Sequence, residues 1–467
     1  MFEINTQNKI PVYEQIYTQL RQQIINGELP KGSRLTPTRT LAKDYHLSRN
    51  TVLSAYLQLQ SEGFIRSVQG SGFYVEDLPE YKGRTIKEER KNTDSDKRKL
   101  LRYDFRYGLI EPNIYTNRGF RKAMKDAYEK LELKKAIYDE DPQGLLSLRQ
   151  AICDHLKQER GVNADPEQLV VTSGHHYSLQ LITSLLSKDE YCFFMEEPGH
   201  QDSRESFIEA GYDVHPLELD NNGAIISKLK GIKNAIVYVT PSHQFPSGYI
   251  LPIGRRMRLL DWASKNNGYI IEDDYDSELR YKERPIPSLH SLDHNDRVIY
   301  FGSFSKSLSS DLRVSYVLLP QSLKLYFNDS QPFINSAVSS LIQLTLNEYI
   351  DSGEYQRRIN SIRNLYRKKH NMIIDFFRNY YEDDIKIFGS GGGTHLLLEI
   401  NTNLDQEKII SKFKENDIGV YPTDIFWANK KKARRNQILI AYSGIPLEEL
   451  NDHLLQMKKV LDEIIDS

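Results

Sequence analysis

Residues 300–316 read YFGSFSKSLSSDLRVSY. An apolar run of strand character leads into the serines that surround Lys306, and Arg313 follows seven residues later. A lysine at the mouth of a sheet, partly removed from water, loses proton affinity and becomes a nucleophile toward an aldehyde. Because most lysines of a charged chain lie in water, the meaning of this one depends on its neighbours.

Apolar runs on both sides of this stretch alternate with helical patterns. The runs read LVVTS, AIVYVTP, YIIEDD and RVIYFGS. This alternation predicts an α/β fold with a mainly parallel sheet covered by helices on both faces. Binding sites in such folds collect at the carboxyl ends of the strands, so the polar residues that end these runs are expected to share one site.

Two of the strand ends predict a phosphate cradle. Ser173, Gly174 and His175 open an amphipathic helix, where free N–H groups and a glycine favour an anion. Ser303 and Arg313 would hold the same phosphate by charge-assisted hydrogen bonds.

A third strand end supplies an acid. Asp273 follows a buried strand and needs a cation, which a protonated ring nitrogen would provide. A metal site is the alternative, and it is disfavoured because no histidine pair lies at ligand spacing nearby. A nucleophilic amine at Lys306, a ring-nitrogen acid and a phosphate cradle together indicate pyridoxal 5′-phosphate (PLP).

The composition excludes several other classes of protein. The chain has 467 residues and a net charge of -2, which favours two or three domains and shows no overall bias toward nucleic acid or membrane surfaces. Without a leader pattern or a long apolar run, we expect a soluble, cytoplasmic protein. The two cysteines, Cys153 and Cys192, lie in apolar segments and are expected to be reduced core thiols.

The composition changes once along the chain. Residues 79–103 carry many charges of both signs and almost no aliphatic side chains, which predicts a flexible linker. It would join an N-terminal domain, residues 1–78, to a large domain, residues 104–467.

The N-terminal segment has the pattern of a winged helix-turn-helix. Apolar residues at helical spacing end at Gly27, a short helix fits residues 38–45, and Ser48 can cap a third helix. Two alternating segments joined by residues 69–72 then predict a hairpin. The third helix exposes Arg49 and Asn50, which suit base edges or phosphates of double-stranded DNA.

From residue 10 to residue 75 the chain resembles the DNA-binding domain of GntR-type bacterial transcription regulators. The motifs SRNTV, AYLQLQSEG and the wing glycines carry this resemblance. It implies DNA contacts from Arg39 and Arg49, with supporting contacts from Arg34, Thr38, Ser48, Thr51 and Gly70. The family usually has Leu-Pro-Ser before the second helix, whereas this chain has Leu35, Thr36 and Pro37, which shifts the proline by one.

From about residue 104 onward the chain resembles a fold-type-I, aspartate-aminotransferase-like domain with a smaller C-terminal α/β part. Together with the GntR-like head, this is the pattern of MocR/GabR-type regulators. The motifs are EEPGH, TPSHQFPSG, IIEDDYDSE, FSKSL and LTLNEYIDSGEYQ. The resemblance implies that Lys306 bonds to PLP, Asp273 pairs with the ring nitrogen and Tyr275 reaches the ring hydroxyl. It assigns phosphate binding to Ser173, Gly174, His175, Ser303 and Arg313, ring stacking to His200, and a reach across a dimer to Tyr138.

Four positions depart from working aminotransferases or from GabR-like sensors. Phe245 replaces the asparagine that contacts the ring oxygen, and Leu439 stands where enzymes place the arginine that clamps a carboxylate. Gly444 and Asp202 stand where GabR-like proteins place their arginines. A carboxylate ligand would lose about 1.5–3 kcal/mol for each charge-assisted bond.

The sequence therefore favours a PLP-binding transcription regulator that acts on operator DNA and has little or no turnover. Its effector is either PLP itself or an amine or amino-acid derivative. The resemblance implies a head-to-tail homodimer and no membrane partner. The alternatives are an active aminotransferase with an accessory DNA-binding head, and an interaction module that has lost its cofactor.

Overall fold

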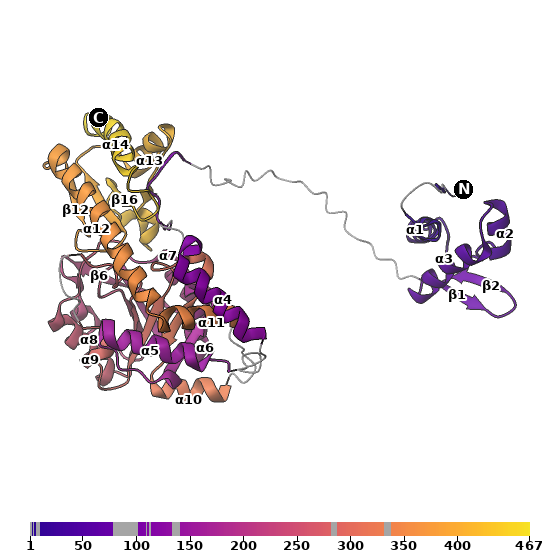
Figure 1. The fold of residues 1–467 in the computed structure, drawn as a ribbon, viewed down its shortest axis with the longest axis horizontal. Coiled ribbons are helices and arrows are strands. Elements are labelled where there is room, and N and C mark those ends of the chain that lie inside the picture. The colour runs from indigo at the N-terminus through magenta and orange to yellow at the C-terminus, as the bar shows by residue number, and fades with distance from the viewer. Residues whose placement is uncertain are drawn as a thin grey trace. The chain divides into compact units, whose positions relative to one another are not determined.

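The computed structural model describes residues 2, 4–5, 10–77, 101–108, 110–111, 114–132, 141–281, 287–330 and 338–467. The chain divides into two compact units, residues 1–97 and 98–467, which are drawn in Figure 1. Residues 79–100 of the expected linker and Tyr138 lie outside the described residues.

The N-terminal unit contains the three helices and the hairpin that the sequence predicts. Its elements are α1 (Val12–Ile25), α2 (Thr38–Asp44), α3 (Arg49–Ser61), β1 (Ile65–Val68) and β2 (Gly72–Val75). The strands pair antiparallel, with Ile65 opposite Val75. Ser48 caps α3, because its Oγ accepts a hydrogen bond from the Thr51 N–H at 3.0 Å. The apolar side chains of the three helices meet in one core around Val52.

The second unit is built on an eight-stranded sheet in the order β4-β11-β10-β9-β8-β5-β6-β7. The central strands β10, β9, β8, β5 and β6 pair parallel, whereas β11 runs antiparallel to both β10 and β4. The bounds are β4 (Leu169–Thr172), β5 (Cys192–Glu197), β6 (Val214–Asp220), β7 (Gly223–Ala224), β8 (Ala235–Val239), β9 (Tyr269–Asp273), β10 (Val298–Ser303) and β11 (Ser315–Leu318).

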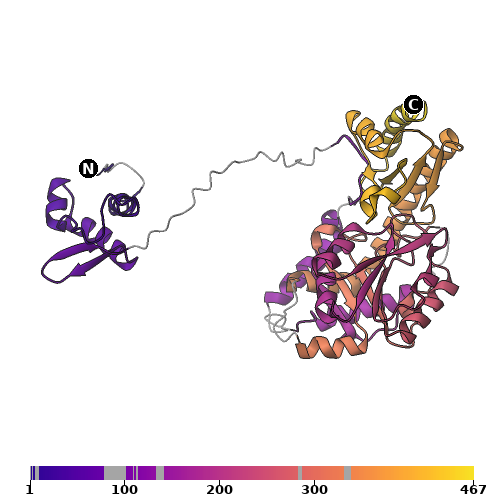
Figure 2. The ribbon, with the colours of Figure 1, turned by 180° about the vertical axis from the view of Figure 1, so that it is seen from behind.

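Both faces of this sheet are covered by helices, as Figure 2 shows from behind. Alternate residues of β8 point to opposite faces: Ile236 packs into the cluster with α6 and α7, and Val237 packs into the cluster with α8. The helices of this part are α4 (Arg118–Glu132), α5 (Leu146–Arg160), α6 (His175–Leu185), α7 (Gln201–Glu209), α8 (Ile253–Lys265), α9 (Leu289–Leu292), α10 (Gln321–Ser330) and α11 (Ser340–Asp351).

A smaller C-terminal part follows the long helix α12 (Glu354–Tyr381). Its four-stranded sheet has the order β12-β13-β16-β15 and carries α13 (Gln406–Glu415) and α14 (Leu450–Ile465). The strands are β12 (Ile385–Phe388), β13 (His395–Ile400), β15 (Tyr421–Pro422) and β16 (Gln437–Ala441). The pair of β3 (Tyr103–Asp104) with β14 (Ile418–Gly419) fastens the start of this unit to its C-terminal part.

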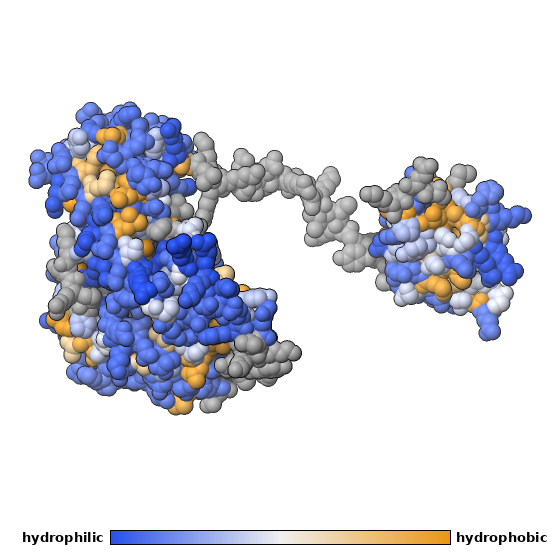
Figure 3. Space-filling model, viewed as in Figure 1, coloured by the Kyte–Doolittle hydropathy of each residue, from blue (hydrophilic) through white to orange (hydrophobic). Residues whose placement is uncertain are grey.

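In Figure 3 hydrophilic residues predominate on the visible face of the large unit, whereas the visible face of the N-terminal unit also carries hydrophobic patches. No helix among the described residues combines the length and apolar character needed to cross a bilayer. Both cysteines are free thiols; Cys153 lies in the core as expected, whereas Cys192 is only partly buried, so it is not a core residue.

Candidate cofactor site and DNA-binding surface

The register of the sheet brings the predicted strand ends together. Thr172, at the end of β4, lies opposite Ser315, which in turn lies opposite Ser303 at the end of β10. Asp273, at the end of β9, is in register with Phe301 of β10. The turn that carries Lys306, the loop that begins with Ser173 and the acid at 273 therefore meet at one edge of the sheet, as the sequence predicts.

The predicted phosphate cradle is formed by backbone close to a guanidinium group. Gly174 precedes α6 with φ +89°, and a Cβ on it would lie 2.9 Å from Nη2 of Arg313. Ser303 pairs with Ser315, which pairs with Thr172 two residues before this glycine. The Ser303 Oγ accepts a hydrogen bond from the Ser305 N–H at 3.0 Å. An exposed arginine over a glycine at a helix start fits the phosphate of PLP, since a side chain at 174 would fill that space.

Two of the predicted residues, His175 and His200, are linked by a serine. The Oγ of Ser203 lies 2.8 Å from Nε2 of His175 and 3.1 Å from Nδ1 of His200. Burial lowers the pKa of both imidazoles to about 4, so both rings are neutral at pH 7. The His200 ring is also 5.5 Å from the Phe245 ring, and its stacking on the cofactor stays a prediction.

Asp273 has a partner that sequence reasoning missed. Its carboxylate accepts a hydrogen bond from the hydroxyl of Tyr238 on β8, and that hydroxyl accepts one from Ser203 Oγ at 3.2 Å. Burial raises the pKa of Asp273 to about 6, while the Tyr238 hydrogen bond acts against this shift. The carboxylate is therefore mostly ionised at pH 7 and suits a protonated ring nitrogen.

Tyr275 is positioned by His243, another residue that the sequence reading did not single out. The Tyr275 hydroxyl donates to the His243 carbonyl oxygen at 3.0 Å and lies 3.1 Å from the Nδ1 of the same residue. That Nδ1 also lies 2.8 Å from Oδ2 of Asp276, so an imidazole–carboxylate pair holds the tyrosine. The signal was present in the quoted run TPSHQFPSG, whose histidine lies four residues beyond the end of the buried strand β8.

An aromatic ring covers one side of the Lys306 amine. Its Nζ lies 3.7 Å from the centroid of the Tyr107 ring. Desolvation lowers the pKa of Lys306 to about 8, although the charge of Asp276 opposes this shift. A substantial share of the amine is thus neutral near physiological pH, as a nucleophile toward an aldehyde requires.

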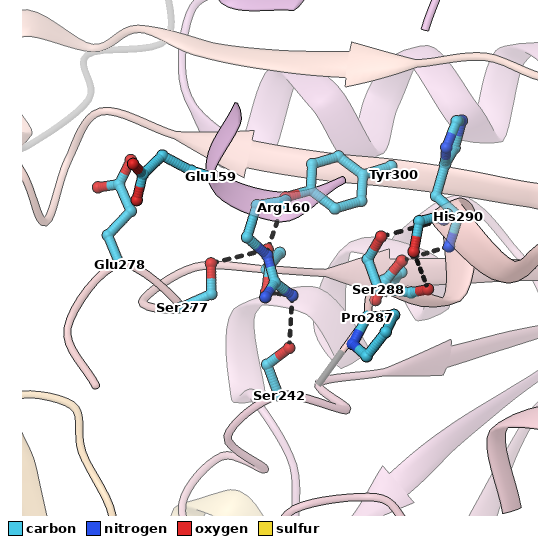
Figure 4. Close-up of polar contacts among 12 residues, drawn as sticks. Glu159, Arg160, Ser242, Ser277, Glu278, Pro287, Ser288, His290 and Tyr300 are labelled. Carbon is cyan, nitrogen blue, oxygen red and sulfur yellow. Dashed lines mark hydrogen bonds and ion pairs between the residues drawn. The ribbon is translucent and has the colours of Figure 1, made fainter. Parts of the chain in front are cut away.

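A buried ion pair joins two of the loops that follow the strands, and Figure 4 shows its arginine, Arg160, beside Ser242, Ser277 and Tyr300. Arg160 Nε lies 2.7 Å from Oδ2 of Asp274, and Arg160 Nη2 donates to Ser242 Oγ at 2.9 Å. Tyr300 and Ser277 donate to the same carboxylate at 2.5 and 2.7 Å. One guanidinium group therefore fixes the loop after β9 to the loop after β8.

An apolar group, here called the aromatic cluster, contains Phe245 and Leu439, two of the positions at which the sequence departs from working aminotransferases. Phe245, Phe426 and Leu439 are buried in it and pack against a partly buried set of residues. This set consists of Tyr107, Tyr275, Tyr421 and Ile425. Among the departures noted in the sequence, Asp202 is exposed, and the guanidinium of nearby Arg204 donates to the carbonyl oxygens of residues 425 and 426.

The predicted DNA-contacting residues lie on one small unit with most of their side chains in solvent. Arg34 lies over the wing, 3.4 Å from the position of a Cβ on Gly72. Thr38 and Thr51 are half-buried, and the exposed residues are Arg34, Arg39, Ser48, Arg49, Asn50 and Gly70. Ser48 and Thr51 also bond to each other, at 2.8 Å between their hydroxyl oxygens, so both support the start of α3.

These features define a fold-type-I PLP domain joined in one chain to a winged helix-turn-helix. Residues 12–75 match the family model of bacterial regulatory proteins of the gntR family, and residues 113–434 match that of aminotransferase class I and II. The chain belongs to the MocR/GabR-type subfamily of GntR transcription regulators, and it is a PLP-binding transcription regulator.

Curated relatives match along nearly the whole chain. The uncharacterized HTH-type transcriptional regulator YdeL of Bacillus subtilis is 32% identical, covering 97% of this chain and 98% of its own. The HTH-type pyridoxine biosynthesis transcriptional regulator PdxR of Corynebacterium glutamicum is 29% identical, with 91% and 90% coverage. The α-aminoadipate aminotransferase LysN of Thermus thermophilus shares the fold of the large unit, with a TM-score of 0.69, 22% identity, and 81% and 96% coverage.

Proposed function

We propose that this regulator senses PLP itself, or an amine-bearing effector, through its aminotransferase-like domain, and that it carries out little or no transamination. One contrast supports this proposal. The groups that suit the cofactor, Lys306, Asp273 and Arg313, lie at one sheet edge, whereas the positions of the enzymes' ring contact and carboxylate clamp hold Phe245 and Leu439. The site therefore keeps what binds a cofactor and lacks what holds a typical amino-acid substrate.

Each predicted residue has a proposed role in holding PLP. When bound, PLP supplies an electrophilic aldehyde on an electron-withdrawing ring. In this proposal Lys306 would bond to the aldehyde carbon with release of the carbonyl oxygen as water, Asp273 would hold the ring-nitrogen proton, and Tyr275 would face the ring hydroxyl. The remaining assignments are phosphate binding by Ser173, Gly174, His175, Ser303 and Arg313, ring stacking by His200, and a contact across the dimer from Tyr138.

The connection between sensing and DNA binding follows the chain. Tyr107, which covers Lys306, lies three residues beyond Asp104, where β3 pairs with β14. The segment that leaves the linker thus enters the cofactor site almost at once. We propose that binding at Lys306 displaces the Tyr107 ring and alters how the two heads of a cytoplasmic, head-to-tail homodimer meet half-sites on operator DNA. Coupling of this kind typically changes affinity by about 5- to 150-fold.

A binding experiment tests the proposal. Duplexes selected from a random DNA pool by the purified protein would be titrated by fluorescence anisotropy with and without PLP. We expect PLP to change the DNA affinity of the wild type by about tenfold and to leave that of Lys306→Ala unchanged. Steady transamination of amino-acid and keto-acid pairs at about 1 s⁻¹ or faster would favour the enzyme instead. If neither PLP nor added amines change the DNA affinity, the proposed sensing function is rejected.

A further inference from the structure

The aromatic cluster beside Lys306 limits the chemistry of an effector, and the inference drawn from it rests on the sensing function proposed above. The Tyr107 ring joins the two, since it lies 3.7 Å from the lysine nitrogen and 5.4 Å from the Phe245 ring. Phe245 in turn packs edge-on against Phe426, with ring centroids 4.9 Å apart. A ligand that reaches Lys306 from this side meets aromatic and aliphatic surface.

Leu439 removes the usual place for a carboxylate. It lies on β16 opposite Leu397 and Tyr421, and its side chain is 0% exposed. A carboxylate brought against it would lose its water without gaining a cation, and an unpaired buried charge is costly. The position therefore acts against amino acids and keto acids.

His395 supplies a second feature that points to a ligand. Its Nε2 lies 3.3 Å from the carbonyl oxygen of Pro246, so Nε2 carries the ring proton and Nδ1 has a free lone pair. This Nδ1 is buried and has no hydrogen-bond partner in the described part of the chain. The ring packs edge-on against Tyr107 and Phe245, at 5.4 and 5.2 Å between centroids.

The electrostatics of this acceptor favour a cationic or N–H-bearing ligand. Burial, together with the charges of His243 and Lys306, holds the pKa of His395 well below its ordinary value, so the imidazole stays neutral. A bare lone pair attracts an N–H group and repels a carboxylate. The Tyr107 face adds a cation–π surface, which already holds the lysine ammonium group.

We propose that the effector binding beside Lys306 is a primary amine with an aromatic or apolar body and no carboxylate. Its amine would donate a hydrogen bond to Nδ1 of His395. Its body would pack against the aromatic cluster beside Phe245.

Matched pairs that differ only in the carboxylate test this proposal. Phenethylamine and phenylalanine, and tyramine and tyrosine, would be titrated against the PLP-loaded full-length protein, with DNA affinity and the thermal unfolding midpoint as readouts. We expect the amine of each pair to act at a concentration at least about tenfold below that of its amino acid. The reason is that each lost charge-assisted bond is worth about 1.5–3 kcal/mol. Methylamine at equal concentration is the control, because any primary amine can react with PLP in solution and so remove it from the protein.

Two variants of one residue separate recognition from folding. Leu439→Arg restores a cation and should reverse the preference toward the amino acids. Leu439→Met keeps an apolar side chain of similar volume and should keep the preference for the amines. A wild type that responds equally to both members of a pair, or better to the amino acid, overturns the proposal, and so does a Leu439→Arg protein that binds DNA but still prefers amines.

Failure of this inference can be told apart from failure of the proposed sensing function. If PLP changes DNA affinity and no amine does so, this inference is wrong while cofactor sensing stands. If neither PLP nor any amine changes DNA affinity, the proposed function itself fails.

Discussion

The Nζ atom of Lys306 lies 3.7 Å from the centroid of the Tyr107 ring, so the amine proposed to bond to PLP is covered by a residue from the start of the large unit. The backbone that leads to this ring is fixed at Phe105, whose N–H donates to the Gly419 carbonyl and whose carbonyl accepts from the Ala441 N–H. One short segment therefore contacts the reactive amine and the C-terminal part of the unit.

The lowered pKa of Lys306 predicts the pH dependence of PLP capture. The neutral amine is the reactive form, and its share rises as pH increases through the pKa of about 8. The capture rate should therefore rise with pH and level off above about 8, whereas an exposed lysine would level off above about 10.4. Stopped-flow absorbance of the cofactor chromophore measures this rate. A midpoint near the exposed value would show that Lys306 is not desolvated.

Substitution of Tyr107 should separate its two effects. Tyr107→Ala opens the amine to water, and because desolvation is the dominant cause of the shift, the midpoint of PLP capture should move upward from about 8. Tyr107→Phe keeps the ring face and should keep the midpoint near the wild-type value. In the alanine variant we also expect PLP to change DNA affinity less than in the wild type. An unaltered DNA response in that variant would remove Tyr107 from the coupling.

Gly174 should be required for PLP binding because of the space that it leaves. In Gly174→Ala a Cβ would lie 2.9 Å from Arg313 Nη2, and we expect PLP affinity to fall about tenfold or more through loss of charge-assisted bonds. Gly231→Ala is the control, since Gly231 has a similar φ of +85° and nothing within 4 Å of the added Cβ. Both variants place a Cβ at positive φ, which costs about 1–3 kcal/mol; Gly174, with φ +89° and ψ 171°, lies in a backbone region that is essentially restricted to glycine. Equal loss of PLP affinity in both, by spectroscopic titration, would contradict the cradle.

Sequence reasoning reached the residues that end the strands of a mainly parallel sheet. Asp273 and Gly174 come within three residues of the last apolar residue of a buried strand, and strand ends in such folds collect at one edge, so their meeting could be predicted. The antiparallel placement of β11 between β10 and β4 was not predicted, because its short apolar run carries no sign of direction. That placement is what brings Arg313 to Gly174.

The residues that sequence reasoning missed come from segments that meet only through tertiary contacts. Tyr107 lies far from Lys306 in the chain and in no periodic pattern, and His395 begins a strand of the C-terminal sheet. Tyr238 is one of several apolar or aromatic residues in a buried strand, and only its hydrogen bond to Asp273 distinguishes it. Such contacts depend on how loops cross, which local periodicity does not encode.

The Arg160–Asp274 pair should be important for stability. Both side chains are almost fully buried, and Arg160→Ala would leave the Asp274 carboxylate without its cation, at a cost of about 3–5 kcal/mol. Although burial acts to raise the pKa of Asp274, Arg160 and the neighbouring hydroxyls hold it below its ordinary value, so the pair's contribution is lost as pH falls below about 4. Urea unfolding of the PLP-loaded protein measures the change. Lys265→Ala, which breaks the exposed pair with Asp261, should cost about 0.5 kcal/mol or less.

Arg49 should contribute more to DNA binding than an equally charged residue outside the predicted contact surface. Its side chain is exposed in the first turn of α3, and the start of that helix is fixed by Ser48. Arg49→Ala therefore removes a predicted DNA contact without loss of core packing. We expect Arg49→Ala to lose about 1–3 kcal/mol of binding free energy on a selected duplex. If Arg49 contacts a base, the variant should also discriminate less between DNA sequences. If it contacts a phosphate, the slope of log affinity against log salt concentration should fall by about 1. Arg21→Ala on α1 is the control, because it removes the same charge from an exposed position beside Phe64. If both variants weaken binding equally across salt concentrations and sequences, the head binds DNA through overall charge and α3 is not its recognition helix.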